Sequence, residues 1–248
     1  MNILYIPTFN KNTEIDNFFI NKDYPLNETE PDIIYVSGGD GSLLHAIQDY
    51  KHLNKPFFGI AAGTKNFLMN RVDLKTLTNL TLNDIVMLKS TVLSVEVVRL
   101  RSNKTKKIVF KSNFSNDLVL GGSIMDFNTF NINGKIVKGL GLLINTPLGS
   151  TAFNLNNEGE IIEDLCSDKV GFSTIVSDIE DKFNEIINIE NIPSIKIESK
   201  RNDCSLFIDG TTKIFKLQEN DEIIIKKNRH IDIGFLDIHE FKNKRLHQ

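Results

Sequence analysis

The 248-residue sequence lacks the features that mark several common classes of protein. It has no tryptophan and only two cysteines, Cys166 and Cys204, which are not in a CxxC spacing, and its five histidines form no HExxH or other ligand pair. We therefore expect neither a disulfide framework nor a structural zinc site, and we assign no residue as a metal ligand. No window approaches the about 18 apolar residues of a membrane helix, and the apolar start is too short for a secretory signal. These absences predict a soluble, cytoplasmic protein with no membrane partner.

A strong charge of either sign is also missing. The 29 basic and 32 acidic residues leave a formal net charge of -3, which offers no global attraction to nucleic acid or to an anionic membrane. We therefore expect no nucleic-acid partner. With 40% hydrophobic residues the chain can bury a sizeable core, and its length favours two compact units.

The first third of the chain has the pattern of an α/β protein. Short apolar stretches at 3–6, 33–36 and 57–60 have the character of buried strands, and the apolar residues between 43 and 47 follow a helical spacing. Strands that alternate with helices are typical of a parallel sheet.

The pattern changes from Thr91 onward. Alternating apolar and polar stretches are broken there by turn residues, which predicts mostly antiparallel β structure. Two of the breaks, Asn133-Gly134 and Asp209-Gly210, are dipeptides that favour type I′ hairpins, because both central residues of that turn need positive φ.

The stretch 36–47, VSGGDGSLLHAI, places three glycines around one carboxylate between a predicted strand and a predicted helix. Such a turn directs backbone N–H groups and the positive end of the helix toward an anion, most naturally a phosphate. It matches neither GxGxxG nor GxxxxGK[ST]. Because an aspartate would repel a phosphate lying on it, Asp40 is better suited to face a metal or a hydroxyl about to be phosphorylated. The alternative is a tight turn in which Asp40 caps the helix.

Two further clusters carry polar groups next to apolar strands. Residues 138–157, KGLGLLINTPLGSTAFNLNN, combine a strand, a proline-glycine turn and a short helix whose small residues let a flat ligand approach the backbone. Asn116 and Asp117 precede an apolar run and could read an adenine edge and ribose hydroxyls. An N-capped helix and a strand-end turn are the respective alternatives.

Together the three clusters resemble one family, the ATP-NAD kinases, also called polyphosphate/ATP-NAD kinases. The order and spacing of the matching segments cover nearly the whole chain: GGDG at 38–41, GIAAGTKNFLMN at 59–70, Asn-Asp at 116–117, TPLGSTAFNLN at 146–156, and a late strand that ends in Asp-Gly at 209–210. The TPLGSTAF stretch is the most specific of these, because GGDG also occurs in phosphofructokinases and related lipid kinases.

The resemblance implies a role for each matching residue. Asp40 would act as the proton acceptor near the 2′-hydroxyl of the adenosine ribose of NAD. The phosphates would be held by Gly38, Gly39 and Gly41, with Thr64 on the ATP side. NAD would contact Asp40 and Gly41 together with Asn116, Asp117, Lys138, Thr151, Ala152, Phe153, Asn154, Leu155 and Asn156. Phe153 stands where the family more often has tyrosine, which keeps a stacking face and loses a hydrogen bond worth about 1 kcal/mol.

Three departures from the family pattern concern the nicotinamide half or its surroundings. Leu140 replaces an aspartate expected to contact the nicotinamide riboside, Asn66 replaces a glycine, and Thr211 replaces a frequent glutamine. None of them replaces the expected proton acceptor. The sequence leaves open whether ATP or polyphosphate is the donor and whether NADH is accepted.

The implied fold is α/β plus all-β. A Rossmann-like α/β domain of residues 1–92, with the return of 229–248, would bind ATP, and a β-sandwich-like domain of residues 93–228 would bind NAD, with the active site in the cleft between them. The implied activity is transfer of the terminal phosphoryl group of ATP, or of polyphosphate, to the 2′-hydroxyl of NAD, which makes NADP.

The resemblance also implies a Mg²⁺ ion carried chiefly by the phosphates, and a homodimer or homotetramer. Two other classes of function stay open as alternatives. One is a GGDG kinase for a lipid or a sugar phosphate. The other is a non-catalytic nucleotide-binding module, which would be expected to lack the acid that Asp40 supplies.

Overall fold

The computed structural model describes residues 1–8, 13–21, 30–62, 66–122, 127–177, 182–199, 204–210 and 215–246. The chain forms two compact units, one of Met1–Ser90 with His230–Gln248 and one of Thr91–Arg229. Two long strands, β4 (Val86–Leu100) and β15 (Glu222–Phe235), carry the chain from one unit to the other. Within the described ranges, no helix is both long and apolar enough to cross a membrane.

The first unit is built on a parallel sheet, as the sequence predicts. Its strands are β1 (Ile3–Ile6), β2 (Ile33–Gly38) and β3 (Phe57–Ala61), and the C-terminal part of β15 pairs with β3 in the same direction. Every residue of β2 is buried, which is typical of a parallel strand covered on both faces.

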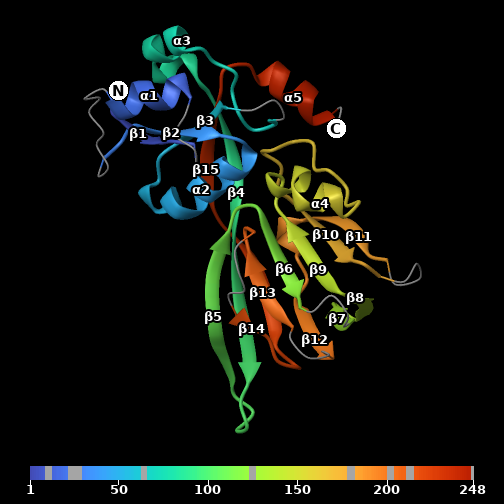
Figure 1. Ribbon diagram of the computed structural model, residues 1–248. Coiled ribbons are helices and arrows are strands. Elements are labelled where there is room, and N and C mark those ends of the chain that lie inside the picture. The colour runs from blue at the N-terminus through green and yellow to red at the C-terminus, as the bar shows by residue number, and fades with distance from the viewer. Residues whose placement is uncertain are drawn as a thin grey trace. The chain divides into compact units, whose positions relative to one another are not determined.

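Helices cover both faces of this sheet (Figure 1). In Figure 1, α1 (Glu14–Asn21) and α3 (Leu74–Asn79) lie on one face, and α2 (Asp40–Tyr50) lies on the other. Phe19 of α1 and Leu77 of α3 pack with Tyr35 and Phe58 in one buried cluster. The predicted helical spacing after the glycine turn is confirmed, because α2 buries Leu43, Ala46 and Ile47. The other helical segments in the described part of this unit are η1 (Lys51–Leu53), η2 (Leu82–Asp84) and α5 (Ile238–Leu246).

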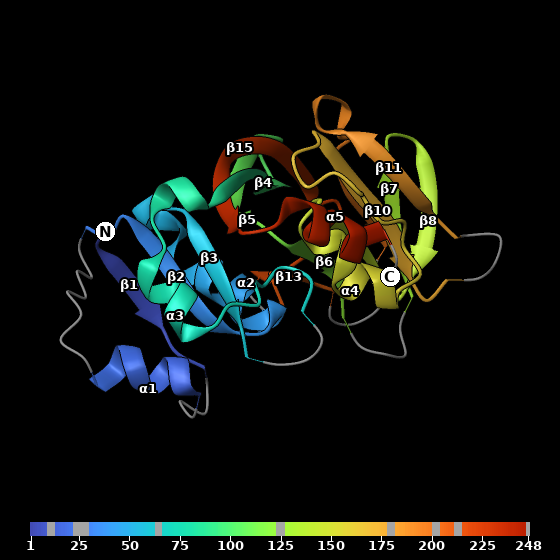
Figure 2. The same ribbon diagram turned by 90° about the horizontal axis from the view of Figure 1, so that it is seen from above.

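The second unit is rich in antiparallel β structure, which confirms the prediction from its alternating pattern. One sheet has the order β11-β10-β9-β6-β13-β14, with bounds Asn184–Asn188, Lys169–Ile175, Gly141–Asn145, Asp117–Gly121, Ser205–Ile208 and Phe215–Lys216. Facing it are the N-terminal part of β15 and strands β12 (Ile195–Ser199), β7 (Asn128–Ile132) and β8 (Lys135–Gly139), together with β4 and β5 (Lys106–Phe114). Figure 2 shows these strands from above.

Both layers of the second unit contribute to one hydrophobic core. Leu142 of β9 and Phe172 of β10 belong to the same buried cluster as Phe130 of β7 and Ile223 of β15. Among the described residues of this unit, the helical segments η3 (Gly149–Thr151) and α4 (Phe153–Asn156) follow β9, and a third, η5 (Ile189–Asn191), follows β11. An α/β unit and a two-layered β unit confirm the predicted fold class.

Only one of the two predicted type I′ hairpins has the predicted length. Asn133 and Gly134 have φ of 50° and 93° and join β7 to β8 with Ile132 paired to Lys135. Asp209 and Gly210 also have positive φ, 49° and 69°. However, β13 and β14 pair Leu206 with Phe215, so their connection is longer than two residues.

Candidate functional site

The glycine stretch lies at the carboxyl end of β2, where open parallel sheets usually bind ligands. Gly38 has φ of 147°, and a Cβ atom there would collide with the side chain of Ser42, so this position needs glycine. Gly39 is extended and forms the N-cap of α2, and a Cβ on Gly41 would meet none of the described residues within 4 Å. The backbone geometry therefore explains Gly38, while Gly41 is free to serve a ligand.

Asp40 is the first residue of α2, and its side chain ties two loops together. Its Oδ1 accepts hydrogen bonds from the backbone N–H groups of Phe67 at 3.1 Å and Leu68 at 2.9 Å, and its Oδ2 accepts from Phe67 at 2.9 Å. The N-cap of α2 is Gly39, which has no side chain, and α2 has no side-chain cap bond among the described residues. The alternative in which Asp40 caps its own helix is therefore wrong, because the carboxylate is turned toward the segment that follows β3.

The segment after β3 contains one of the departures from the family pattern. Asn66 is buried, and it is not among the described residues with positive φ, so a glycine is not required at this position. A Cβ on Gly39 would lie 3.4 Å from Asn66 Oδ1, which places Asn66 beside the glycine turn. The predicted ATP-side residue Thr64 and the third departure, Thr211, lie outside the described residues.

In the second unit, the predicted Asn116-Asp117 pair opens β6 and is held from both sides of its backbone. Asp209 accepts hydrogen bonds from the N–H groups of Ser115, Asn116 and Asp117, the shortest being 2.7 Å from Asn116 N to Oδ1. On the carbonyl side, Thr146 N donates to Asn116 O at 3.0 Å, and Thr146 Oγ1 donates to Ser115 O at 2.6 Å.

Gly149 packs directly on this clamped segment. A Cβ atom there would lie 2.6 Å from the carbonyl carbon and 2.7 Å from Oδ1 of Asn116. The N–H of Gly149 also donates to Thr146 Oγ1 at 3.3 Å. Segments around residues 116, 149 and 209, which the sequence singled out separately, therefore meet at one place in the fold.

The side chains of Asn116 and Asp117 differ in which of their polar atoms are hydrogen-bonded within the protein. Asn116 Nδ2 donates to Asp117 Oδ2 at 3.0 Å, while Asn116 Oδ1 is buried without a hydrogen-bond partner among the residues that the structure describes. Burial, followed by the negative charge of Asp209, raises the pKa of Asp117 from its ordinary value of 3.8 to about 6, against the lowering effect of the Gly210 backbone N–H. An orphaned buried acceptor is costly, so a ligand N–H donor would stabilise this site.

The predicted adenosine-wrapping residues form η3 and α4. Thr151, Ala152 and Leu155 are half-buried, Asn156 is exposed, and Phe153 is 43% exposed, which leaves a ring face for stacking. Asn154 is different. It is buried, its Nδ2 donates to the carbonyls of Ser150 and Glu160, and its Oδ1 accepts from Ser173 Oγ. Both ends of the Asn154 amide are thus engaged within the protein.

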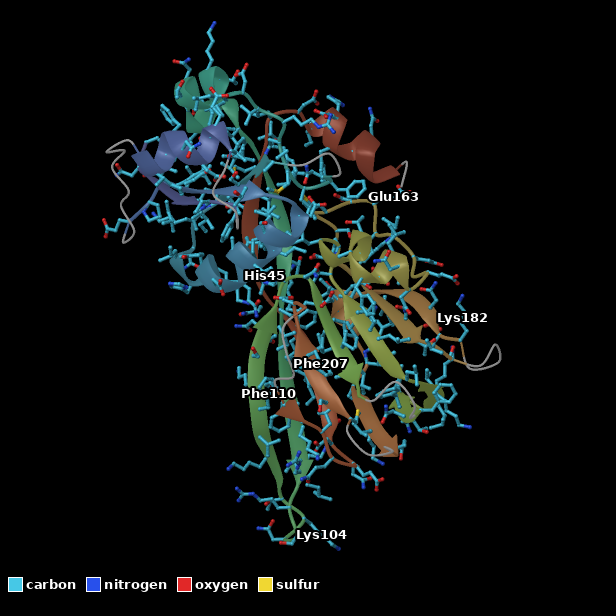
Figure 3. All side chains as sticks on the ribbon, viewed as in Figure 1. His45, Lys104, Phe110, Glu163, Lys182 and Phe207 are labelled. Carbon is cyan, nitrogen blue, oxygen red and sulfur yellow. The ribbon has the colours of Figure 1, made fainter. Side chains whose placement is uncertain are left out.

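Lys138 and Leu140 lie close together in sequence but in different settings. Lys138 is exposed on β8, opposite Thr129 of β7, in the sheet that does not contain β6. Leu140 is half-buried in the bend between β8 and β9. It lines an apolar pocket of about 160 Å³ together with residues that include Phe207, which Figure 3 labels on β13. The alternative in which Leu140 continues the buried strand of Leu142 and Ile144 is therefore wrong.

Three side chains that organise these loops were not assigned a role from the sequence. Asp209 and Thr146 clamp the Asn116 backbone, as described above. Asn70 donates to the carbonyls of Gly59 and Gly234, both at 3.0 Å, and accepts from Leu236 N at 2.9 Å, which joins β3 to the end of β15. The sequence signals for Asp209 were its Asp-Gly dipeptide, interpreted as a hairpin turn, and its place in the family pattern, which assigned no role to its side chain.

Comparison with known proteins supports the resemblance to the NAD kinases. A scan against protein-family models finds no match. Among curated proteins, the NAD kinases of Rickettsia bellii (strain OSU 85-389) and Rickettsia prowazekii (strain Madrid E) are each 35% identical to this chain, over 145 and 139 residues. The chain resembles the NAD kinases. These alignments cover 58% and 54% of this chain and 56% and 52% of the relatives, so the chain spans about half the length of the NAD kinases it matches.

A solved structure gives a second comparison. The crystal structure of yeast NADH kinase complexed with NADH aligns with a TM-score of 0.68 over 86% of this chain and 65% of that chain, at 21% identity. At this identity the match shows the fold. The sequence relatives confirm the predicted resemblance to the ATP-NAD kinases, and the structural relative confirms the α/β plus β-rich fold class.

Proposed function

We propose that this protein is an NAD kinase, which transfers the terminal phosphoryl group of ATP to the 2′-hydroxyl of the adenosine ribose of NAD and makes NADP. The observation that carries the proposal is the clamped Asn116-Asp117 pair. It offers a buried amide oxygen, without a partner among the described residues, beside a buried carboxyl group. An amide acceptor suits the exocyclic amine of adenine, and a carboxylate suits ribose hydroxyls. The similarity to the Rickettsia NAD kinases supports the same ligand.

The NAD site in this proposal uses groups of the second unit with different tasks. Asn116 and Asp117 bind the adenosine, and the exposed ring of Phe153 offers it a stacking face. Thr151, Ala152, Leu155 and Asn156 supply further contacts from η3 and α4, and Lys138 supplies a positive charge. Asn154 contributes by holding the loop, because its amide bonds to Ser150, Glu160 and Ser173.

The phosphoryl donor in this proposal binds at the glycine stretch of the first unit. The N–H groups at the start of α2, around Gly38, Gly39 and Gly41, lie at a helix N-terminus, which suits phosphate oxygens. Thr64 is assigned to the same donor from the family resemblance. The donor is ATP in this proposal, and polyphosphate is a second donor to be tested.

Asp40 takes the proton in this proposal. The 2′-oxygen of NAD forms a new bond to the terminal phosphorus, the bridging bond of that phosphorus to ADP breaks, and the hydroxyl proton moves to the Asp40 carboxylate. The N–H groups of Phe67 and Leu68 orient this carboxylate.

A magnesium ion fits the residues present if the phosphates supply most of its ligands. Within the described ranges, no group of three or more His, Cys, Asp or Glu side chains lies together in a way that could hold a metal. Mg²⁺ commonly binds through substrate phosphates, waters and one or two carboxylates, and Asp40 is the carboxylate of the glycine stretch. When bound with ATP, the ion would neutralise charge on the transferring group.

The test is NADP formation by the purified protein, Asp40→Asn, and Asp49→Asn as a matched control. Asp49 is an exposed residue of the same helix. We expect Asp40→Asn to lower turnover about a hundredfold or more and to keep NAD affinity, while Asp49→Asn behaves as the wild type.

Two outcomes would contradict the proposal. If the wild type makes no NADP from NAD, magnesium and either ATP or polyphosphate, the protein is not an NAD kinase. In that case, phosphorylation of a lipid or a sugar phosphate would favour another kinase, and nucleotide binding without turnover would favour a binding module. If Asp40→Asn keeps near wild-type turnover, Asp40 only anchors the segment at residues 67–68.

Light scattering after size exclusion tests the proposed homodimer or homotetramer.

A further inference from the structure

In the second unit, the buried carboxylate of Asp209 accepts hydrogen bonds from three consecutive backbone N–H groups. Asp209 Oδ1 accepts from Asn116 N at 2.7 Å, Ser115 N at 3.1 Å and Asp117 N at 3.2 Å. Its Oδ2 accepts from Ser115 N and Ser115 Oγ, both at 3.1 Å. Successive N–H groups that point to one centre form an anion-binding nest. Here the anion is a side chain of the protein itself, 5% exposed.

The backbone around Asp209 explains how its side chain reaches this nest. Strand β13 pairs with β6 as far as Ile208 opposite Leu118, and Asp209 N donates to Asp117 O at 2.9 Å. The chain then turns, with positive φ at both Asp209 and Gly210. The turn places the Asp209 carboxylate against the start of β6, and the N–H of Gly210 bonds to the Asp117 carboxylate.

The clamp fixes the direction of the two side chains proposed to recognise adenosine. The N–H groups of Asn116 and Asp117 bond to Asp209, and the carbonyl of Asn116 bonds to Thr146. The bonds to both backbone groups of Asn116 hold the backbone from which its side chain projects. In this arrangement Nδ2 donates to Asp117 Oδ2, and Oδ1 has no partner among the described residues.

We propose that Asp209 is a positioning residue: it sets the affinity for the adenosine half of NAD by holding the backbone of Ser115, Asn116 and Asp117, and it does not contact NAD. The inference rests on the proposed NAD kinase function. Its physical basis is preorganisation, because a loop already held in its bound conformation loses less entropy when the ligand binds. The chemistry of phosphoryl transfer is assigned to the other unit, so Asp209 should affect binding more than turnover.

The charge of Asp209 gives a second readout, the pH at which NAD affinity changes. The groups that face Asp117 are the Asp209 carboxylate, the Gly210 N–H and the Asn116 amide, and among them only Asp209 is charged. Asp117 should accept hydrogen bonds from ribose hydroxyls when ionised, so NAD affinity should fall as the pH drops below about 6. Removal of the neighbouring charge should move the midpoint of this change to lower pH.

The experiment measures NAD and AMP binding by calorimetry between pH 5 and 8 for the wild type, Asp209→Asn, Ser115→Ala and Asp221→Asn. Asp221 is a matched control, because it is also a buried acid of the second unit, and it binds Arg99 and the Gln218 N–H away from the Asn116 segment. We expect Asp209→Asn to weaken both ligands tenfold or more, to lower the pH midpoint by at least half a unit, and to change turnover at saturating NAD less than threefold.

The other two variants keep the inference testable if Asp209→Asn does not fold. Ser115→Ala removes only the hydroxyl donor to Asp209 and should weaken NAD about threefold with unchanged turnover at saturation. Asp221→Asn should lower the melting temperature and leave the NAD dissociation constant unchanged. A folded Asp209→Asn or Ser115→Ala with wild-type affinity would overturn the role of Asp209, as would an unchanged pH midpoint in Asp209→Asn. A wild type that binds no NAD would instead overturn the proposed function.

Discussion

The tightest contact of the candidate NAD site is the one between Gly149 and the Asn116 backbone, and Gly149→Ala tests it. A Cβ at position 149 would lie 2.6 Å from the carbonyl carbon of Asn116, with the carbonyl oxygen closer still. Carbon atoms pack at about 3.5 to 4.0 Å, so the two backbones would have to separate by about 1 Å. A flexible side chain could move away at little cost, but the nearest atoms here belong to a backbone that Asp209 and Thr146 hold in place.

The stability lost in Gly149→Ala would come from overpacking and from the hydrogen bonds that this separation would weaken. Overpacking of this kind costs about 1 to 3 kcal/mol. Weakening the bonds from Thr146 N and Oγ1 to the carbonyls of Ser115 and Asn116 would add about 1 kcal/mol. We expect Gly149→Ala to lower the free energy of unfolding by about 2 to 4 kcal/mol, which corresponds to a fall of about 5 to 15 °C in Tm. NAD affinity should drop at least tenfold, because Asn116 Oδ1 must move as well.

Gly41→Ala is the matched stability control, because a Cβ there meets none of the described residues within 4 Å and the residue lies in α2. An alanine inside a helix should raise stability by about 0.5 to 1 kcal/mol. Thermal unfolding followed by circular dichroism, with calorimetric titration of NAD, measures both effects. Gly149→Ala with the wild-type Tm and NAD affinity would refute the reasoning, since the loop would then adjust freely.

Two further predictions concern residues that do not hold the Asn116 backbone. Leu140→Asp should tighten NAD several-fold and cost about 1 kcal/mol of stability, because Leu140 is half-buried in a bend and the acid would stay partly hydrated; a lower Tm without a gain in affinity in calorimetry would assign Leu140 to packing alone. Burial would raise the pKa of Asp16, but hydrogen bonds from Thr8, Tyr5 and Thr13 outweigh it and lower the pKa to about 2. These hydrogen bonds should add about 1 to 2 kcal/mol to the free energy of unfolding above about pH 4, and this contribution should be lost toward pH 2. Urea unfolding of Asp16→Asn should lack this pH dependence. An equal pH dependence in both proteins would contradict the prediction.

Local patterns in the sequence predicted the parts of the fold that depend on neighbouring residues. The glycine stretch was correctly placed between β2 and α2 because apolar periodicity changes there from a strand to a helix. Asn133-Gly134 was correctly predicted as a hairpin because a type I′ turn needs only those two residues and two flanking strands.

Contacts between distant segments could not be predicted in the same way. Asp40 bonds to residues 27 and 28 positions further on, and Asp209 bonds to residues 92 to 94 positions before it. These contacts depend on which strands are neighbours, and the pairing of β6 with β13 leaves no local signal in either strand. The Asp-Gly dipeptide at 209–210 correctly indicated positive φ. That the Asp209 carboxylate also bonds to the segment at residues 115–117 follows only from the pairing of β6 with β13.

Residue type alone also fails to separate side chains that hold the loops from side chains that are left for a ligand. Asparagine, aspartate and glycine serve turns and ligand sites equally well, because their short polar groups or bare backbones suit both. Asn116 and Asn154 came from two segments with the same family resemblance. The Asn154 amide bonds to protein at both ends, and a Cβ on Gly159 would collide with it, so this amide is part of the loop's own packing. The Asn116 amide is bonded at Nδ2, and its Oδ1 lacks a partner among the described residues. A ligand that replaces a missing hydrogen bond gains more than one that must first break an existing bond, and this difference favours Asn116 over Asn154 as the residue that reads the base.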